Sequence, residues 1–199
     1  MPKLPGTDLR HLAWIWLVIG LWFTPATAQT GNFNIPQLMQ VLARIETRES
    51  AFTEKKILAL LNEPLISSGT LRYRRPGYIE RMTVAPRQER FIYEGGKVTV
   101  ETSGRQRQFQ VKDQPALAVL VESIRATLAG DGDALQRHFQ LRLSGTLAGW
   151  NLEMSPLASD LLSRIRLIRI SGVQDELRQV EILETSDDRT IMMIDAVRR

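Results

Sequence analysis

Residues 67–96 read "SSGTLRYRRPGYIERMTVAPRQERFIYEGG" and alternate between apolar and polar side chains over much of their length. A period of two is typical of β-strands with one buried face. Leu71 and Tyr73 lie on one face of the first predicted strand, and two arginines lie on the other. The apolar face then ends at Arg75, a permanent cation directly before a proline.

Two interpretations of Arg75 remain open at this point. In the first, Arg75 is an edge residue whose stem packs on its neighbours while its head reaches water. In the second, the guanidinium points inward and needs acceptors, of which the nearest are helix carbonyls or Ser, Thr and Asp side chains. Bonds of the second kind would hold helices over a hollow, and a ligand that displaces the helices would have to break them.

Short strands surround this stretch on both sides. Glycine and proline separate them, and the Gly95–Gly96 pair is typical of a two-residue hairpin turn with positive φ angles. We predict strands over residues 50–60, 67–75, 78–85, 89–94, 97–102, 106–112, 138–144, 149–155, 164–170, 177–185 and 189–196.

Two segments have helical rather than strand periodicity. The stretch "NFNIPQLMQVLARIET" (residues 32–47) has a capping residue in Asn34 and a proline in its first turn. The stretch "PALAVLVESIRATLAG" (residues 115–130) begins with a proline, ends with a glycine, and places Leu117, Val121 and Ile124 on one face. Asp131 or Asp133 can cap a further short helix.

About eleven strands with one apolar face each cannot form a flat sheet, so the sheet has to curl or close. The helices are too few to fill the concave side completely. We therefore predict a mainly β (α+β) fold: an incomplete, strongly curved antiparallel β-barrel of about eleven strands, with a helical lid over an apolar cavity.

The first 28 residues have the features of a secretory signal peptide. Lys3 and Arg10 precede the apolar run "LAWIWLVIGLWFT", and "PATA" supplies small residues before a cleavage site after Ala28. The run is shorter than the roughly 20 residues of a spanning helix, which disfavours the alternative of a membrane anchor. We expect one exported, periplasmic domain over residues 29–199. Gln29, not cysteine, follows the expected cut, so no lipid anchor is expected.

Composition disfavours catalysis and nucleic-acid binding. Loss of the leader changes the net charge only from +4 to +3, and no basic block stands out. The chain has no cysteine, His138 is the one histidine beyond the leader, and no nucleophile or phosphate-loop motif occurs. Capping and turn roles account for the acidic pairs 131/133 and 187/188, with a hard-metal site as the weaker alternative. We expect no enzyme, no metal and no cofactor.

Several motifs together resemble the LolA family of periplasmic carriers of outer-membrane lipoproteins. They are "FTEK" at residues 52–55, the glycine at 69, "LRYRRP" at 71–76, the Ala-Pro pair at 85–86 and "IYEGGKVTV" at 92–100. The resemblance covers residues 34–112 and continues more loosely to the C-terminus.

The resemblance implies an incomplete antiparallel barrel with a helical lid over a hydrophobic cavity. It also implies that Arg75 bonds to the lid helices and keeps the empty cavity closed, and that Ile79 lines the cavity mouth. Two features depart from the family pattern. Arg72 and Arg81 stand where the family often has tryptophan, and the chain ends at Arg199 without the family's extra C-terminal segment.

We therefore expect a monomeric carrier of an acylated lipoprotein or another lipid. It would receive its cargo from an inner-membrane transporter, deliver it to an outer-membrane acceptor and touch membrane surfaces transiently. Alternatives are a lipid-binding adaptor or sensor of a membrane lipid exporter, an esterase, which lacks a nucleophile–base pair, and a lipidated acceptor, which Gln29 disfavours. The expected ligand-binding residues are Leu71, Tyr73, Arg75, Ile79, Leu117, Val121 and Ile124.

Overall fold

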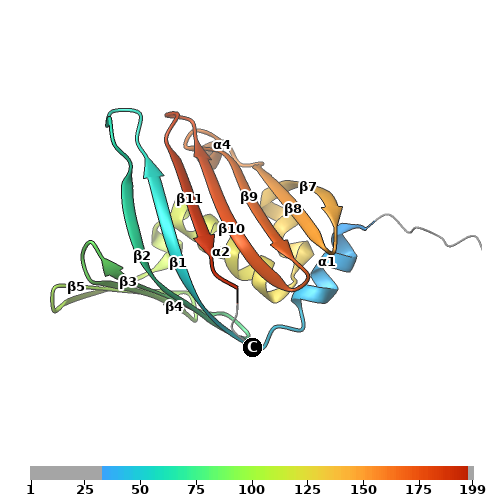
Figure 1. Ribbon diagram of the computed structural model, residues 1–199, viewed down its shortest axis with the longest axis horizontal. Helices are drawn as coiled ribbons and strands as arrows, with labels where there is room; N and C mark the ends of the chain where they lie inside the picture. Colours follow the sequence, from blue (N-terminus) through green and yellow to red (C-terminus); the bar gives the residue numbers. More distant parts are fainter. Residues whose placement is uncertain (1–32, 197–199) are drawn as a thin grey trace, which may run out of the picture. The chain divides into compact units, whose positions relative to one another are not determined.

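A single antiparallel sheet of eleven strands dominates the structure, a computed structural model that describes residues 33–196 (Figure 1). Its spatial order is β6-β5-β4-β3-β2-β1-β11-β10-β9-β8-β7, so β6 and β7 are edges and the sheet is not closed. The strands are β1 Thr47–Ile57, β2 Leu65–Arg74, β3 Tyr78–Ala85, β4 Glu89–Glu94, β5 Lys97–Thr102, β6 Arg105–Gln110, β7 Phe139–Thr146, β8 Gly149–Pro156, β9 Ile165–Val173, β10 Glu176–Glu184 and β11 Arg189–Ile194. The predicted mainly β, incomplete antiparallel barrel is confirmed.

The first and last strands join the two halves of the sheet. Phe52 of β1 lies opposite Ile194 of β11, and the pairing continues to Ile57 opposite Arg189. This pairing brings residues about 130 to 140 positions apart in the chain into one wall, so the N-terminal and C-terminal strands share a concave face.

The helices lie on one face of the sheet (Figure 1). They are α1 Ile35–Leu42, α2 Pro115–Ala129, α3 Gly132–His138 and α4 Ser159–Leu162, with a 3₁₀ turn η1 Val111–Asp113. Asn34 caps α1 in a capping box with Gln37, as its position predicts. Gly130 ends α2 with a φ of 69°, a conformation that favours glycine.

Helices α1 and α3 fill the concave side over the C-terminal strands. Their buried side chains pack in one cluster with the inward side chains of β8 and β9: Leu38, Leu42, Leu135, Trp150, Leu152, Met154, Ile168 and Ile170. The alternation in β8 and β9 supplies this face, because every second residue points toward the helices. Helices α1 and α3 are thereby fixed over the C-terminal half of the sheet.

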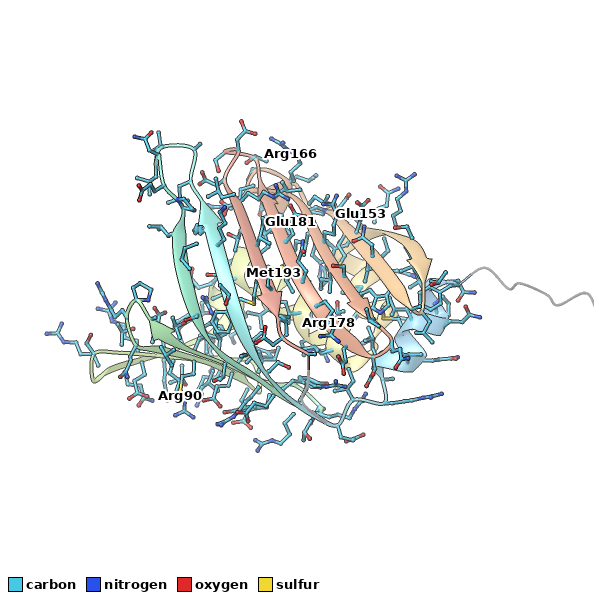
Figure 2. The ribbon with its side chains drawn as sticks, in the orientation of Figure 1. Arg90, Glu153, Arg166, Arg178, Glu181 and Met193 are labelled. Atoms are coloured by element: carbon cyan, nitrogen blue, oxygen red, sulfur yellow. The ribbon has the colours of Figure 1, made fainter. Side chains whose placement is uncertain are left out.

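Ion pairs cover the outer, convex face of the C-terminal strands. Glu181 of β10 is buried and accepts hydrogen bonds from Arg169, at 2.7 Å, and from Arg189. Arg169 also donates to Glu153 at 2.9 Å, and Figure 2 shows Glu153 and Glu181 on the face away from the helices. A buried carboxylate with two arginine partners has its desolvation offset by charge-assisted bonds.

Several strand boundaries differ from the predictions by up to three residues. β1 runs over Thr47–Ile57 rather than 50–60, because Thr47 already pairs with Arg74 of β2. β6 ends at Gln110 because the next three residues form the 3₁₀ turn. The short helix α4 was not predicted. Within residues 33–196, no helix has both the length and the apolarity to cross a bilayer.

Candidate functional site

A cavity of about 320 Å³ lies between α2 and the concave face of the sheet. This volume is at the lower end of the range of about 300–1,000 Å³ that is typical of small-molecule sites. Six of the seven predicted ligand-binding residues line the cavity: Leu71, Tyr73, Ile79, Leu117, Val121 and Ile124. Arg75 lies beyond Tyr73 in the chain and does not line the cavity.

Strand and helix periodicity place these side chains together. On β2 and β3 the inward residues alternate and meet in register, so that Tyr73 lies opposite Ile79 and Leu71 lies opposite Arg81. On α2 the cavity residues follow at intervals of three and four, which keeps them on one face of the helix. The apolar wall therefore combines the alternation of residues along strands with the spacing of three and four residues along a helix.

Arg75 joins the end of β2 to the ends of two helices. Its Nη2 donates to the carbonyl of Ala43, the C-cap of α1, and to the carbonyl of Ala129, the last residue of α2, at 3.2 Å. Its Nε donates to the carbonyl of Ile45 at 3.4 Å and lies 3.7 Å from a carboxylate oxygen of Glu46. The guanidinium thus points to helix carbonyls, which is the geometry of the second interpretation above.

The position of Arg75 suits its charge. The last carbonyls of a helix have no partner within the helix and carry the negative end of its dipole. A guanidinium with five donors can satisfy carbonyls of both helices at once. One side chain therefore stabilises the C-terminal ends of α1 and α2 where they meet the end of β2.

A second set of polar contacts holds the corner between α2 and α3. Arg125 donates to Glu122 at 2.6 and 2.7 Å and to Asp131 at 3.2 Å. Asp131 in turn accepts from the backbone N–H of Ala134 at 2.9 Å, as predicted for a helix cap. The Ala134 bond and then Arg125 keep the pKa of Asp131 below its usual value, despite partial burial.

Tyr73 stands at the end of the cavity nearest Arg75. Its side chain is buried, and its hydroxyl has no hydrogen-bond partner among residues 33–196. Burial raises the pKa of Tyr73, and the nearby charges of Arg75 and Arg125 oppose that shift. The phenol is therefore a neutral polar group with no hydrogen-bond partner among the described residues, and its cross-strand neighbour on β1 is the cavity-lining Arg48.

The opposite end of the cavity is polar. Arg81 donates to Glu54 at 2.8 Å and to the Ser67 hydroxyl at 3.3 Å, and its guanidinium lies 4.9 Å from the centre of the Phe52 ring. All of these groups are on the concave face. Arg72, the other departure from the family pattern, instead donates to Glu49 at 2.8 Å, on the other face of β2. Of the two arginines, only Arg81 directs its charge to the inner wall.

The sequence predictions missed the contribution of the C-terminal strands. Val180 and Ile182 of β10, and Met192 and Ile194 of β11, complete the cavity wall. Their alternation was visible in the sequence, but only the long-range pairing of β1 with β11 joins β11 and β10 to the N-terminal wall. Phe91 of β4 and Leu120 and Leu128 of α2 were also missed as site residues.

Carboxylates outside the cavity have structural roles. Asp188 accepts the backbone N–H of Ala59 at 2.8 Å, and Asp131 is a helix cap. Over residues 33–196, no group of three or more His, Asp or Glu side chains is placed to hold a metal ion. His138 is the last residue of α3.

Comparisons with known proteins identify the family of this chain. Residues 27–197 match the family model described as "Outer membrane lipoprotein carrier protein LolA-like". An outer-membrane lipoprotein carrier protein of Dechloromonas aromatica is 26% identical over 177 residues, which cover 88% of this chain and 81% of that protein.

Among solved structures, a LolA superfamily protein from Nitrosomonas europaea is 6% identical, with a TM-score of 0.42 over 81% of this chain and 90% of that one. The lipoprotein LppX of Mycobacterium tuberculosis is 9% identical, with a TM-score of 0.42 over 80% of this chain and 94% of that one.

Proposed function

Because the chain belongs to the family of LolA-like outer membrane lipoprotein carrier proteins, which is a family of carriers rather than enzymes, we propose that it carries acyl chains between membranes. The apolar cavity under α2 would hold the acyl chains of a lipoprotein or of another lipid. The protein would receive them from a transporter in the inner membrane and deliver them to an acceptor in the outer membrane. The observation that supports this proposal best is an apolar cavity covered by a helix with a tethered end.

The energetics of lipid transfer suit such a cavity. Moving each CH₂ group from water to an apolar site is favourable by about 0.8 kcal/mol. One long acyl chain therefore gains on the order of ten kcal/mol. A bilayer offers the same stabilisation, and exchange between bilayer and cavity is therefore close to neutral. A carrier needs a cavity that shields the chain from water yet returns it readily.

Arg75 would set the direction of transfer. A bound chain that pushes the C-terminal ends of α1 and α2 away from the sheet has to break the bonds from Arg75 to Ala43 and Ala129. These bonds re-form when the cavity empties, and they favour release. Loading would then need an energised partner in the inner membrane, whereas unloading would not.

We place the protein in the periplasm as a monomer formed by residues 29–199. The leader that supports this location, residues 1–28, lies outside the described residues. Contact with transporter, acceptor and membrane would be transient, since a carrier has to leave each of them.

Native mass spectrometry of the protein purified gently from the periplasm tests the proposal. A co-purifying lipoprotein or phospholipid that organic extraction removes would support the carrier and identify the class of its cargo. A protein that is empty and also fails to bind a fluorescent fatty-acid probe would contradict it. That result would favour the alternative of an adaptor subunit of a lipid exporter.

A further inference from the structure

Exposed apolar side chains gather at one end of the sheet. Six of them, from the β1–β2 tip and the β8–β9 connection, form what we call the leucine edge: Leu60, Leu61, Leu65, Ile66, Leu157 and Leu162. Leu60 is 97% exposed, and the other five are between 46% and 54% exposed. Toward the opposite ends of the C-terminal strands, Leu147 is 38% exposed, Val173 39% and Met193 49%.

Two hydrogen bonds make the leucine edge continuous. The β1–β2 tip is tied to the β10–β11 turn, because the backbone N–H of Ala59 donates to Asp188. That turn is tied to the end of α4, because the Thr185 hydroxyl donates to the carbonyl of Ser163 at 2.9 Å. Figure 1 shows the tip, the turn and α4 along the same end of the sheet.

The fold leaves these side chains about half exposed or more, and Leu60 almost completely exposed. The pairing between β1 and β2 reaches only Lys56 opposite Leu65, so the intervening residues extend past the sheet. Single exposed leucines are common on protein surfaces, but a run of them on a protruding hairpin marks an interaction site.

We propose that the leucine edge docks this protein on a lipid bilayer, with Leu60 and Leu61 inserted among the acyl chains. Protruding side chains suit a bilayer, because a fluid interior accepts them without a complementary recess. Lys55 and Lys56 lie at the base of the hairpin, before the leucines in the chain. Neither lysine forms an ion pair within residues 33–196. Their ammonium groups would meet lipid phosphates when the leucines are inserted.

The cavity extends toward this edge. Glu54, which lines the cavity, precedes the two lysines, and Thr190, which also lines it, follows the β10–β11 turn. Docking by the leucine edge would therefore bring the polar end of the cavity close to the membrane surface. The inference goes beyond the proposed function and does not require that the cavity hold a lipid.

Flotation with lipid vesicles tests the inference directly. The full chain, expressed with its own leader and purified from the periplasm, is mixed with vesicles of phosphatidylethanolamine and phosphatidylglycerol at 3:1, or of phosphatidylcholine alone. The double variant Leu60→Glu/Leu61→Glu should lower the partition coefficient at least about ten-fold. Leu147→Glu is the matched control, since Leu147 is exposed at the opposite end, and it should leave partition unchanged.

The two lysines predict a dependence on lipid charge. Lys55→Gln and Lys56→Gln should each weaken binding to the anionic vesicles about five-fold, with little effect on phosphatidylcholine. Failure of the unaltered protein to bind either vesicle would overturn the inference. Equal losses in the Leu60/Leu61 and Leu147 variants would do so as well.

A fluorescence measurement reports insertion itself. The chain has no cysteine, so Leu60→Cys and Leu147→Cys each provide a single site for an environment-sensitive dye. Vesicles should shift the emission to the blue at position 60 and leave position 147 unchanged. Lipid extraction of the same preparations reports cavity occupancy separately, so a failed carrier and a failed docking site remain distinguishable.

Discussion

Nη2 of Arg75 donates a hydrogen bond across 3.2 Å to the carbonyl oxygen of Ala129, 54 residues further along the chain. The bond connects a strand end to the C-terminus of α2, the helix that covers the cavity. It is also one of several bonds from a single guanidinium, so one substitution can remove them together. This makes the role of Arg75 open to direct tests.

Replacement of Arg75 by leucine should loosen the helix ends. Hydrogen bonds to charged groups contribute about 1.5–3 kcal/mol, so we expect the free energy of unfolding to fall by about that amount. Amide hydrogen exchange near residues 126–131 should become faster. If Arg75 is the latch, Arg75→Leu should also fill with lipid but fail to release it, and a normal transfer rate would exclude this role.

Arg74→Leu is the matched control for that experiment. Arg74 is adjacent in sequence but exposed, and its ion pair with Glu94 spans 3.5 Å. Exposed pairs contribute about 0–1 kcal/mol. The control should therefore unfold and exchange like the unaltered protein.

Tyr73→Phe should not destabilise the protein. The Tyr73 hydroxyl is buried without a partner among the described residues, and such a group costs about 1–3 kcal/mol. Its removal keeps the ring in place, so the free energy of unfolding in urea should rise by about 1 kcal/mol. A clear loss of stability would mean that the hydroxyl is hydrogen-bonded in solution.

Arg81 and Glu54 should behave as one unit. Arg81→Met leaves the Glu54 carboxylate facing an apolar wall and should lower the free energy of unfolding by about 1–3 kcal/mol. Adding Glu54→Gln should restore part of this loss and tighten binding of a fluorescent fatty acid, because that end of the cavity becomes less polar. Additive effects in the double-mutant cycle would show that the two residues are independent.

Arg166→Met is the matched control for the inner pair. Arg166 forms an ion pair with Asp187 at 2.9 Å, but both side chains are exposed, and Figure 2 shows Arg166 at the end of the sheet. Its loss should change neither unfolding nor fatty-acid binding measurably.

The stability of the corner between α2 and α3 should depend on pH through Asp131. Its pKa is lowered in the folded protein by the Ala134 N–H and by Arg125, so its contribution to stability is present above the ordinary Asp value of about 3.9. That contribution is lost as the pH falls through the lowered pKa. Asp131→Asn keeps a capping side chain but removes this dependence.

Thermal unfolding of both proteins from pH 7 to pH 3 measures the effect. The unaltered protein should be more stable than Asp131→Asn at pH 7, and the difference should shrink as the solution is acidified. A constant difference would show that the charge of Asp131 contributes nothing.

Local pattern was sufficient to predict most of the fold. The Asn34 cap, the Pro115 start and the Gly130 end of helices, and the Gly95–Gly96 hairpin depend on backbone conformations that nearby residues set. Alternation also predicted that Leu71 and Tyr73 face inward, since a strand has only two faces. These features could be predicted from the sequence because each depends on residues a few positions apart.

Strand pairing decided the rest of the cavity. β1 lies between β2 and β11, and this order brings Met192 and Ile194 beside the N-terminal wall. In the β2–β3 pair, the register that runs from Arg74 opposite Tyr78 to Gly69 opposite Thr83 aligns Arg81 with Leu71, next to Glu54 on the inner face. Neither the order nor the register is a property of one strand alone.

For this protein, sequence alone determined the eleven-strand class, the helical segments and the apolar faces, because these follow from periodicity and capping over short distances. Only the tertiary structure decided that Arg75 meets Ala43 and Ala129, that Arg81 pairs with Glu54, and that the leucine edge stands clear of the core. Hydrogen bonds and burial act over a few ångströms in space, and only the folded chain brings such distant residues within that range.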